Sequence, residues 1–336
     1  MQRKILVTGG AGFIGSNFIR HHLKTYPHDQ IINLDALTYA GNLANLSDCE
    51  KLPQYHFVHG NITDEKLVNQ LCQDIDLIVH FAAESHVDRS IVNPTAFLQT
   101  NVLGTLVLLE AAVKNKVGHF HHISTDEVFG SLPLEGEQKF TLNSAYDPHS
   151  PYSASKAGSD HLVRAYGDTY GLSYTITNCS NNYGPYQFPE KLFALAITNL
   201  LQGKKVPLYG DGLNVRDWLF VQDHVLAIEA VLNAGVKGKT FLVGGLQKDV
   251  SNRQVLEIII TQMGKNPAEE ITYVTDRPGH DRRYSVDWSQ TAQTLAWQPQ
   301  VSLETGIAQT IAWYKNHQSW WQPLLERAAN FKTSSQ

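Results

Sequence analysis

Thr8-Gly9-Gly10-Ala11-Gly12-Phe13-Ile14-Gly15 decides the fold, because it joins a short apolar run, residues 5–8, to an amphipathic one. Glycines at the spacing G-x-x-G-x-x-G allow a tight turn and let backbone N–H groups approach a pyrophosphate. They also let the following helix pack closely on the sheet. A tight turn without any ligand is the alternative. We expect a dinucleotide site with contacts from Gly9, Gly12, Phe13, Ile14 and Gly15.

Asp35 supports this interpretation, because it ends the second predicted strand 20 positions after Gly15. A carboxylate there accepts hydrogen bonds from both hydroxyls of an adenosine ribose and repels a 2′-phosphate, which favours NAD(H) over NADP(H). A solvated loop aspartate is the alternative. Asn61, at the end of the third predicted strand, could contact adenine, although its spacing alone fits a turn residue.

Short β-branched runs alternate with amphipathic stretches outward from this motif. This alternation predicts right-handed βαβ units and a mostly parallel sheet covered on both faces. We expect strands at 5–8, 31–34, 56–59, 77–81, 120–124 and 174–179, and helices at 13–23, 65–71, 96–113 and 150–170. The predicted fold class is α/β, a Rossmann-like doubly wound parallel sheet with a smaller mixed α/β substrate domain.

Beyond residue 181 the rhythm loosens into short strands, helices and Pro/Gly turns. We expect residues 1–180 and about 216–248 to form the NAD-binding domain. Residues 181–215 and about 249–330 would then form the second, substrate-binding domain.

The composition of the 336 residues excludes several classes of function. The net charge is −5, with acidic and basic residues mixed along the chain, so we expect no nucleic-acid partner. Three cysteines without a CxxC pair argue against a disulfide framework and a structural zinc site. The N-terminus enters a strand at once, so we expect no signal peptide, no membrane span and a cytoplasmic location.

Tyr152 and Lys156 form a Tyr-x-x-x-Lys motif on a predicted helix, where this spacing puts both side chains on one face. The nearby ammonium is expected to favour the phenolate and lower the pKa of Tyr152, so that the phenolate can take a hydroxyl proton as hydride leaves. The motif also occurs by chance, and the glycine-rich turn upstream favours the catalytic interpretation.

Ser124-Thr125-Asp126-Glu127 closes the strand that precedes this helix. Thr125 is placed to bond the same substrate hydroxyl. Asp126 and Glu127 could form a solvated turn or a helix N-terminus. At the carboxyl end of a parallel strand, where such sheets bind their ligands, they fit a general acid and a general base better.

His119, His121 and His122 raise the question of a metal site. No fourth ligand stands at a recognisable spacing, so we expect no metal and assign these histidines to strand packing.

With these motifs in hand, the chain resembles the dTDP-glucose 4,6-dehydratases among the extended short-chain dehydrogenases, nearly from end to end. The resemblance rests on residues 8–15, 35–42, 82–88, 124–129, 151–156, 181–192, 215–218 and 276–284.

The resemblance implies a three-stage reaction on a dTDP-sugar with tightly bound NAD. Tyr152, with Lys156 and Thr125, helps NAD⁺ remove hydride from C4 of the sugar. Glu127 then takes the acidified C5 proton while Asp126 protonates the leaving C6 hydroxyl. Hydride returns to C6 and C5 is reprotonated, which leaves a 4-keto-6-deoxy sugar.

The resemblance also implies the binding residues. Further cofactor contacts are Asp35, Ala36, Leu37, Thr38, Asn61, Ile62, Ala82, Ala83, Ser85, Thr100, Tyr152, Lys156 and Asn182. The sugar-nucleotide site comprises Ser85, Thr125, Asn181, Lys191, Leu192, Pro207, Leu208, Tyr209, Arg216, Asn252 and the stretch 280–284, in which His280, Arg282 and Tyr284 are the contacts. A diphosphate needs forked cationic donors, which independently favours Arg216 and Arg282, although each arginine alone fits a surface salt bridge.

Three residues depart from the family pattern: Ala36 stands for lysine, Asn61 for aspartate, and Asn178 for an arginine common there. Asn61 still offers an oxygen acceptor, Asn178 concerns local packing, and Ala36 has no explanation.

Rival functions remain open at this point. A nucleotide-sugar 4-epimerase shares the redox residues but needs no acid and base, and a 4,6-dehydratase of another nucleotide sugar differs only in the base it reads. A non-catalytic NAD(H) sensor would not need the catalytic cluster. The family implies a homodimer through residues 96–113 and 153–170, although those apolar faces could also be intramolecular core. The downstream pathway, rhamnose or another deoxysugar, is open.

Overall fold

The computed structural model describes residues 2–245, 248–276 and 279–333, so Arg277 and Pro278 of the last family motif lie outside the described residues. One parallel sheet organises the first lobe, in the strand order β11-β6-β5-β4-β1-β2-β3. Its strands are β1 (Lys4–Thr8), β2 (Gln30–Asp35), β3 (Tyr55–His59), β4 (Leu77–His80), β5 (His119–Thr125), β6 (Tyr174–Cys179) and β11 (Lys239–Val243).

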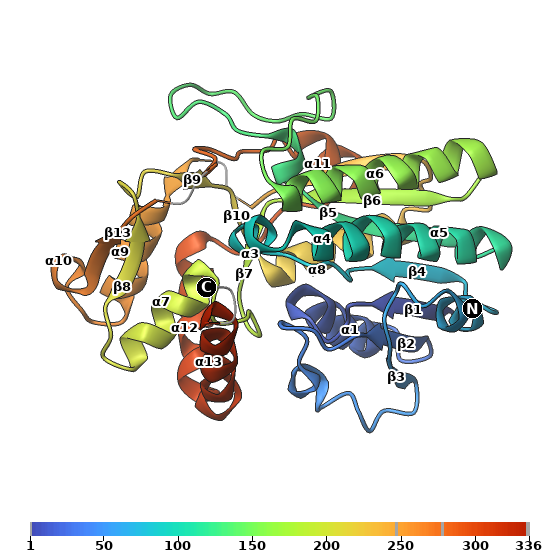
Figure 1. The fold of residues 1–336 in the computed structure, drawn as a ribbon, viewed down its shortest axis with the longest axis horizontal. Coiled ribbons are helices and arrows are strands. Elements are labelled where there is room, and N and C mark those ends of the chain that lie inside the picture. The colour runs from blue at the N-terminus through green and yellow to red at the C-terminus, as the bar shows by residue number, and fades with distance from the viewer. Residues whose placement is uncertain (1, 246–247, 277–278, 334–336) are drawn as a thin grey trace.

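Helices cover both faces of this sheet (Figure 1). One face carries α1 (Phe13–Thr25) and α8 (Val221–Asn233), whose apolar residues share a core with β1, β2 and β4. The other face carries α2 (Glu65–Leu71), α5 (Thr105–Lys114) and α6 (Pro151–Tyr170) around a second core. The predicted doubly wound α/β class is therefore confirmed.

Shorter elements precede the helices of the second face and connect the strands. They are η1 (Leu43–Leu46), α3 (Val87–Val92), α4 (Pro94–Phe97), the π-helical η2 (Leu98–Gly104) and the 3-10 turn η3 (Asp126–Phe129).

The helix predicted at 96–113 spans α4, η2 and α5. By length and apolar composition alone, Pro94–Lys114 would be long enough to cross a membrane. Half of its apolar window is buried, and it packs beside α2 and α6 as a core helix does.

A second lobe has its own apolar core, built around Phe193, Trp218, Tyr314 and Trp321 (Figure 1, left). Its helices are α7 (Leu192–Leu201), α9 (Asn252–Gln262), α10 (Pro267–Glu270), α12 (Leu303–Asn316) and α13 (Gln318–Thr333). Its strand pairs are β7 (Asn181–Tyr183) with β10 (Trp218–Phe220), β8 (Val206–Tyr209) with β13 (Ile271–Val274), and β9 (Val215–Arg216) with β12 (Val250–Ser251).

The domain limits expected from the sequence stay a prediction. One segment differs from them in its packing: α11 (Ser289–Leu295) lies against β11, and the Thr291 hydroxyl donates to the carbonyl of Leu242 at 2.7 Å. Trp297 joins a small core with Val243 and Leu219. Residues assigned by sequence to the second domain thus return to the first lobe.

The strand order fixes where a ligand can sit. The chain runs from β1 outward through β2 and β3, then crosses to β4 on the other side of β1. Ligands of open α/β sheets bind at the carboxyl ends of the strands beside such a switch point. The loops after β1, β2, β4 and β5 meet at that edge.

Candidate active site

The glycine-rich turn lies at the switch point and has no room for side chains at two positions. Gly9 has a φ of +73°, and a Cβ there would stand 2.5 Å from the nitrogen of Ala82. A Cβ on Gly15 would stand 2.5 Å from the carbonyl oxygen of Gly9. Among the described residues no side chain caps the N-terminus of α1, so its free N–H groups suit a pyrophosphate.

Asp35 is buried at the end of β2, beside this turn. One carboxylate oxygen accepts from the N–H of Ala11 at 2.9 Å and the other from the N–H of Leu37 at 2.8 Å. Burial raises the pKa of Asp35, and these two hydrogen bonds oppose the rise. The remaining lone pairs can accept ribose hydroxyls, so the turn and Asp35 together fit the adenosine half of NAD.

The other predicted cofactor residues are spread along the same edge of the sheet, and some are already engaged. The Asn61 amide oxygen accepts from the backbone and hydroxyl of Thr63, both at 3.0 Å, which is the turn role that its spacing suggested. The Asn182 side chain bonds His224 at 2.9 Å and the carbonyl of Ser180 at 2.9 Å. Ala36 to Thr38 follow β2, Ile62 follows β3, Ala82 to Ser85 follow β4, and Thr100 lies in η2.

Lys156 is held rigidly on α6. The helix starts with a capping box between Ser150 and Ser153, with proline at its first position, and ends at a left-handed glycine. The buried ammonium of Lys156 donates to the carbonyl of Ile123 at 2.8 Å and lies 3.3 Å from Nε2 of His122. Burial lowers the pKa of Lys156 to about 8, against the raising effect of Asp160.

Tyr152 precedes Lys156 by one helical turn, as the motif predicts. Desolvation, reinforced by the charge of Glu127, raises the pKa of Tyr152 well above its usual value. The expectation that Lys156 lowers the pKa of Tyr152 is therefore wrong for the protein without cofactor or substrate. The reason is geometric, because the ammonium is bonded to the backbone of β5 and desolvation of the phenol dominates.

Thr125, Asp126 and Glu127 stand at the carboxyl end of β5. The Thr125 hydroxyl accepts from the N–H of Glu127 at 3.3 Å and so caps η3. Asp126 is fully buried, and its Oδ2 has no hydrogen-bond partner among the described residues. Burial and the charges of Glu127 and Asp217 raise the pKa of Asp126 well above its usual value. A carboxyl group whose pKa is raised in this way suits a general acid.

Arg216 and Tyr284 bring the second lobe to this cluster. The buried Arg216 donates to the carbonyl of Asp281 at 3.0 Å, and its guanidinium lies 4.4 Å from the centre of the Tyr284 ring. After desolvation, the charge of Glu127 contributes most to the raised pKa of Tyr284. The structure therefore brings together Asp126, Glu127, Tyr152, Arg216 and Tyr284.

Not every predicted substrate residue joins this cluster. Arg282 forms an ion pair with Asp211 at 2.9 Å near the surface. This is the surface salt bridge that the sequence analysis gave as the alternative for a single arginine. His280 bonds Asp276 at 2.6 Å and its ring meets the Tyr209 ring edge to face.

The remaining predicted substrate residues belong to four elements of the second lobe. The amide oxygens of Asn181 and Asn252 are buried and lack hydrogen-bond partners among the described residues, which suits a polar ligand. Lys191 and Leu192 begin α7, and Pro207 and Leu208 lie in β8.

Sequence reasoning missed a buried polar network beneath Lys156. Nε2 of His122 lies 3.3 Å from Oδ1 of Asp160. The Asn178 amide donates to Oδ2 of Asp160 at 3.0 Å and to the carbonyl of Thr125 at 3.1 Å. The hydrogen bond from His122, with the charges of His122 and Lys156, outweighs burial and lowers the pKa of Asp160 to about 2. Asn178, which stands where the family commonly has arginine, therefore belongs to the hydrogen-bond network that surrounds Lys156.

The three strand histidines form hydrogen bonds with serine and threonine hydroxyls. His119 bonds Ser173 and Thr175 at 2.8 Å each, His121 bonds Thr175 at 2.8 Å, and His122 faces α6. Within residues 2–245, 248–276 and 279–333, no group of acidic, histidine and cysteine side chains could hold a metal ion.

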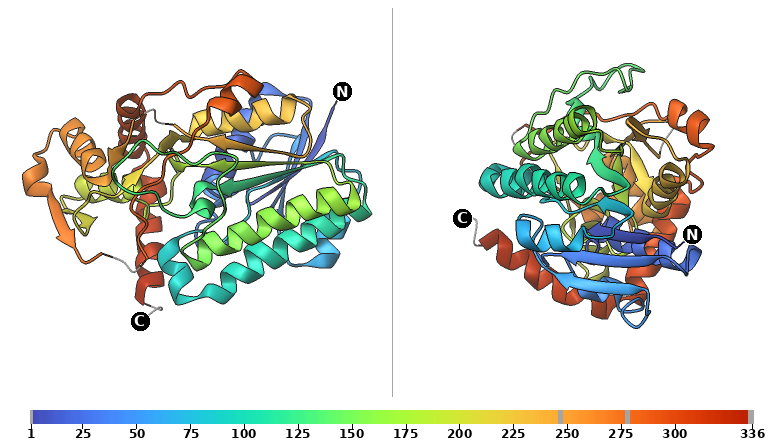
Figure 2. Two further views of the ribbon diagram at one scale, coloured as in Figure 1. Left: turned by 90° about the horizontal axis from the view of Figure 1, so that it is seen from above. Right: turned by 90° about the vertical axis from the view of Figure 1, so that its right-hand side faces the viewer.

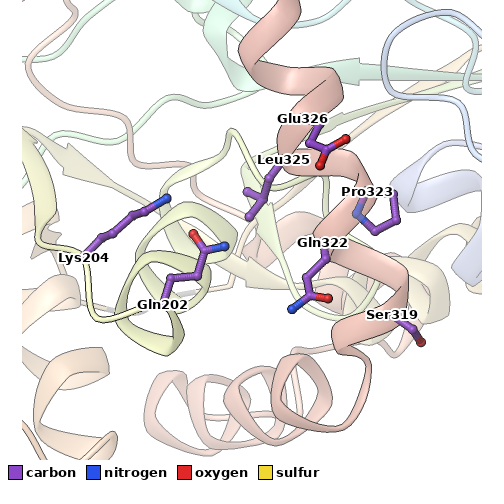
Figure 3. Close-up of a pocket in the computed structure, with 7 residues that line it drawn as sticks. All are labelled: Gln202, Lys204, Ser319, Gln322, Pro323, Leu325 and Glu326. Atoms are coloured by element: carbon purple, nitrogen blue, oxygen red, sulfur yellow. The ribbon is translucent and has the colours of Figure 1, made fainter.

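A groove of about 610 Å³ lies away from this cluster, between the C-terminal end of α7 and the helix α13 (Figure 3). Gln202 and Lys204 line it on one side and residues of α13 on the other. None of the predicted site residues lines it.

Comparison with known proteins gives one consistent picture. The family model described as GDP-mannose 4,6 dehydratase matches residues 6–310. The dTDP-glucose 4,6-dehydratase of Shigella flexneri is 49% identical over 340 aligned positions, which cover 94% of each chain. The crystal structure of the dTDP-glucose 4,6-dehydratase DesIV from Streptomyces venezuelae, solved with NAD bound, is 49% identical with a TM-score of 0.92, covering 96% of this chain and 99% of DesIV.

The fold is shared more widely than the activity. The UDP-glucose 4-epimerase of Thermotoga maritima is 29% identical with a TM-score of 0.85, covering 93% of this chain and 99% of the epimerase. The fold alone therefore does not separate water loss from epimerisation.

Proposed function

This chain belongs to the dTDP-glucose 4,6-dehydratase family, and we propose that it converts dTDP-glucose to dTDP-4-keto-6-deoxyglucose and water with bound NAD. It is a hydro-lyase that uses its cofactor without consuming it. The observation that carries this conclusion is the buried Asp126, whose pKa is raised beside the second carboxylate of Glu127. An epimerase needs no such acid and base.

The redox residues act on the C4 hydroxyl. Thr125 and Tyr152 hold that hydroxyl, and the phenolate of Tyr152 takes its proton while the hydride leaves C4. Lys156 keeps a positive charge behind this pair. When bound, NAD⁺ supplies the hydride acceptor, later the hydride donor, and a positive ring charge that favours the phenolate.

The two carboxyl groups then remove water. Glu127 takes the C5 proton, which the new C4 ketone has made acidic, and the electron pair forms the C5–C6 double bond. The C6–O bond breaks as Asp126 gives its proton to the leaving hydroxyl. Hydride adds to C6, C5 takes up a proton, and a 4-keto-6-deoxy sugar results.

The binding roles rest on the same arrangement. Gly9 to Gly15 and Asp35 would hold the adenosine half of the cofactor, with the loops after β3 and β4 and Thr100 and Asn182 completing its site. Arg216 is a buried cation that would bind the diphosphate, and Arg282 would have to leave Asp211 to bind it. Tyr209 and His280 offer aromatic rings that would contact the nucleobase of the substrate. The unpartnered amide oxygens of Asn181 and Asn252 offer hydrogen-bond acceptors.

We also propose a homodimer. The helices α5 and α6 run side by side along one face (Figure 2), and exposed apolar side chains continue along the helical run that precedes α5. Leu98 is 55% exposed and Leu103 is 49% exposed. A second copy related by a two-fold axis would bury this apolar face.

A cytoplasmic location is proposed from the chemistry of the thiols. Cys49, Cys72 and Cys179 are all buried and free. Free thiols persist in reducing compartments.

The direct test is turnover by the purified protein. Given dTDP-glucose, it is expected to yield a sugar nucleotide lighter by one water, without net consumption of added NAD⁺. UDP-glucose and GDP-mannose, tested in parallel, separate the possible bases. Unchanged dTDP-glucose, or its conversion to dTDP-galactose, would contradict the proposal.

A further inference from the structure

The C-terminal helix α13 belongs to the second lobe but contacts the first lobe at the loop after β2. Trp320, Leu324 and Arg327 have i, i+4, i+7 spacing, so they share one face of the helix. That face meets residues 37–45, nearly 300 positions earlier in the chain. The opposite face carries Gln322 and Glu326 and lines the open groove of Figure 3.

Arg327 forms hydrogen bonds with several backbone carbonyl groups of this loop. Its guanidinium donates to the carbonyl oxygen of Gly41 at 3.0 Å, to that of Leu37 at 3.3 Å, and to that of Thr38. Leu37 has a φ of +50°, a conformation that a leucine rarely adopts. A planar fork of five N–H donors can hold three converging carbonyls, and a single ammonium is less suited to this task.

Trp320 reaches the glycine-rich turn through one intermediate. Its indole N–H donates to the Asn45 amide oxygen at 2.9 Å. The buried Asn45 in turn donates to the carbonyl of Ala11 at 2.8 Å, and the N–H of Ala11 is bonded to Asp35. The helix is thus connected to the pyrophosphate turn and to the ribose carboxylate.

Apolar contacts complete this attachment. Leu324 packs in a small buried cluster with Tyr39 of the loop and with Phe188. The ring centres of Tyr39 and Phe188 lie 5.7 Å apart. Tyr39 also donates to the carbonyl of Ser85, in the loop after β4. The segment that follows Asp35 is therefore fixed between α13 and the loop after β4.

We propose that α13 is a clamp on the adenosine side of the cofactor site, with Arg327 and Trp320 as positioning residues that slow the release of NAD. The inference rests on the cofactor placement given under the proposed function. A loop that is already ordered loses less entropy when it binds, and preorganisation acts mainly by slowing dissociation. The reaction returns its hydride to the same sugar, so slow release of the cofactor suits it.

The test compares variants on the two faces of α13. Arg327→Ala removes the fork, Trp320→Phe removes one donor while keeping an aromatic ring, and Arg327→Lys keeps the charge alone. Gln322→Ala and Glu326→Ala are matched controls on the opposite face. The fraction of NAD retained after gel filtration and the rate of NAD dissociation are measured on folded protein, without any sugar nucleotide.

For Arg327→Ala we expect NAD to dissociate at least about tenfold faster, with Trp320→Phe and Arg327→Lys in between and both controls at the wild-type rate. Turnover of dTDP-glucose should fall through a raised KM for NAD, and saturating NAD should restore kcat. Wild-type NAD retention in Arg327→Ala, or a kcat that added NAD does not restore, would overturn the clamp. If Arg327→Ala fails to fold, Trp320→Phe decides by the same criteria. Failure of the wild type to dehydrate dTDP-glucose would count against the proposed function and leave the NAD comparison valid.

Discussion

Asp160→Asn is the sharpest test of how this fold prepares Lys156 for its proposed catalytic role. Asp160 lies one turn after Lys156 on α6, fully buried, with His122 of β5 beside both. The substitution keeps the volume of the side chain and removes its negative charge. Cys179 also raises the pKa of Lys156, but Asp160 has the largest raising effect.

The expected shift follows from the sign of that interaction. An opposite charge nearby changes a pKa by roughly 1–3 units, so the pKa of Lys156 should fall from about 8 to about 7 or below. The ammonium is present below its pKa and lost above it. At pH 7 the protonated fraction would fall from roughly nine tenths to roughly half after a shift of about one unit, and to about one tenth after two. The kcat/KM at pH 7 should therefore drop about two- to tenfold and largely recover as the pH is lowered.

The assay is the pH profile of kcat/KM for dTDP-glucose with NAD-loaded protein. Asp168→Asn is the matched control, because Asp168 is exposed on the same helix. Loss of the hydrogen bonds to Tyr146 and Asn178 should also lower stability by about 1–3 kcal/mol, so a thermal melt at each pH identifies the range in which the variant is folded. An alkaline limb at the wild-type pH in folded Asp160→Asn would refute this account of Lys156.

Three further outcomes are expected. Asp126→Asn should slow water loss by about 10²–10⁴-fold while NADH absorbance still reports C4 oxidation, and equal loss of both steps would contradict its role as the acid. Gly9→Ala places a Cβ 2.5 Å from the nitrogen of Ala82 and should abolish NAD retention; Gly171→Ala, with a similar φ and open space, should cost only about 1 kcal/mol in a melt and keep NAD. Leu103→Glu should give a monomer by light scattering, and a dimer that survives it would locate the interface elsewhere.

The strands and the cofactor turn could be predicted because their signals are local. The strand predicted at 174–179 and the helix predicted at 65–71 have those bounds in the structure. The others differ by a few residues at their ends, except that the helix predicted at 96–113 comprises α4, η2 and α5. Gly9 needs glycine for reasons visible in a strand, turn and helix sequence. The same applies to the turn role of Asn61, which follows from hydrogen bonds within three residues.

Contacts between distant segments were beyond the sequence pattern. Arg327 and the loop at Leu37 are far apart in the chain, and no periodicity signals that they meet. His122 looked like a packing histidine because its partner Asp160 lies on the following helix, with the loop after β5 between them. The packing of α11 against β11 could not be predicted for the same reason, because the sequence of a short helix does not indicate which face of a sheet it will cover.

Residue type alone gives no physical reason to choose which of Asp126 and Glu127 is the acid and which is the base. The two side chains are neighbours in sequence and nearly identical in chemistry, so either order was chemically possible. The structure separates them by environment, because Asp126 is fully buried between Glu127 and Asp217 whereas Glu127 is partly exposed. Burial and two negative neighbours disfavour the charged form of a carboxyl group, and here they outweigh the opposing charge of Arg216. Burial at the end of β5 thus supports the proposed roles, with the first of the two adjacent carboxyl groups as the proton donor and the second as the base.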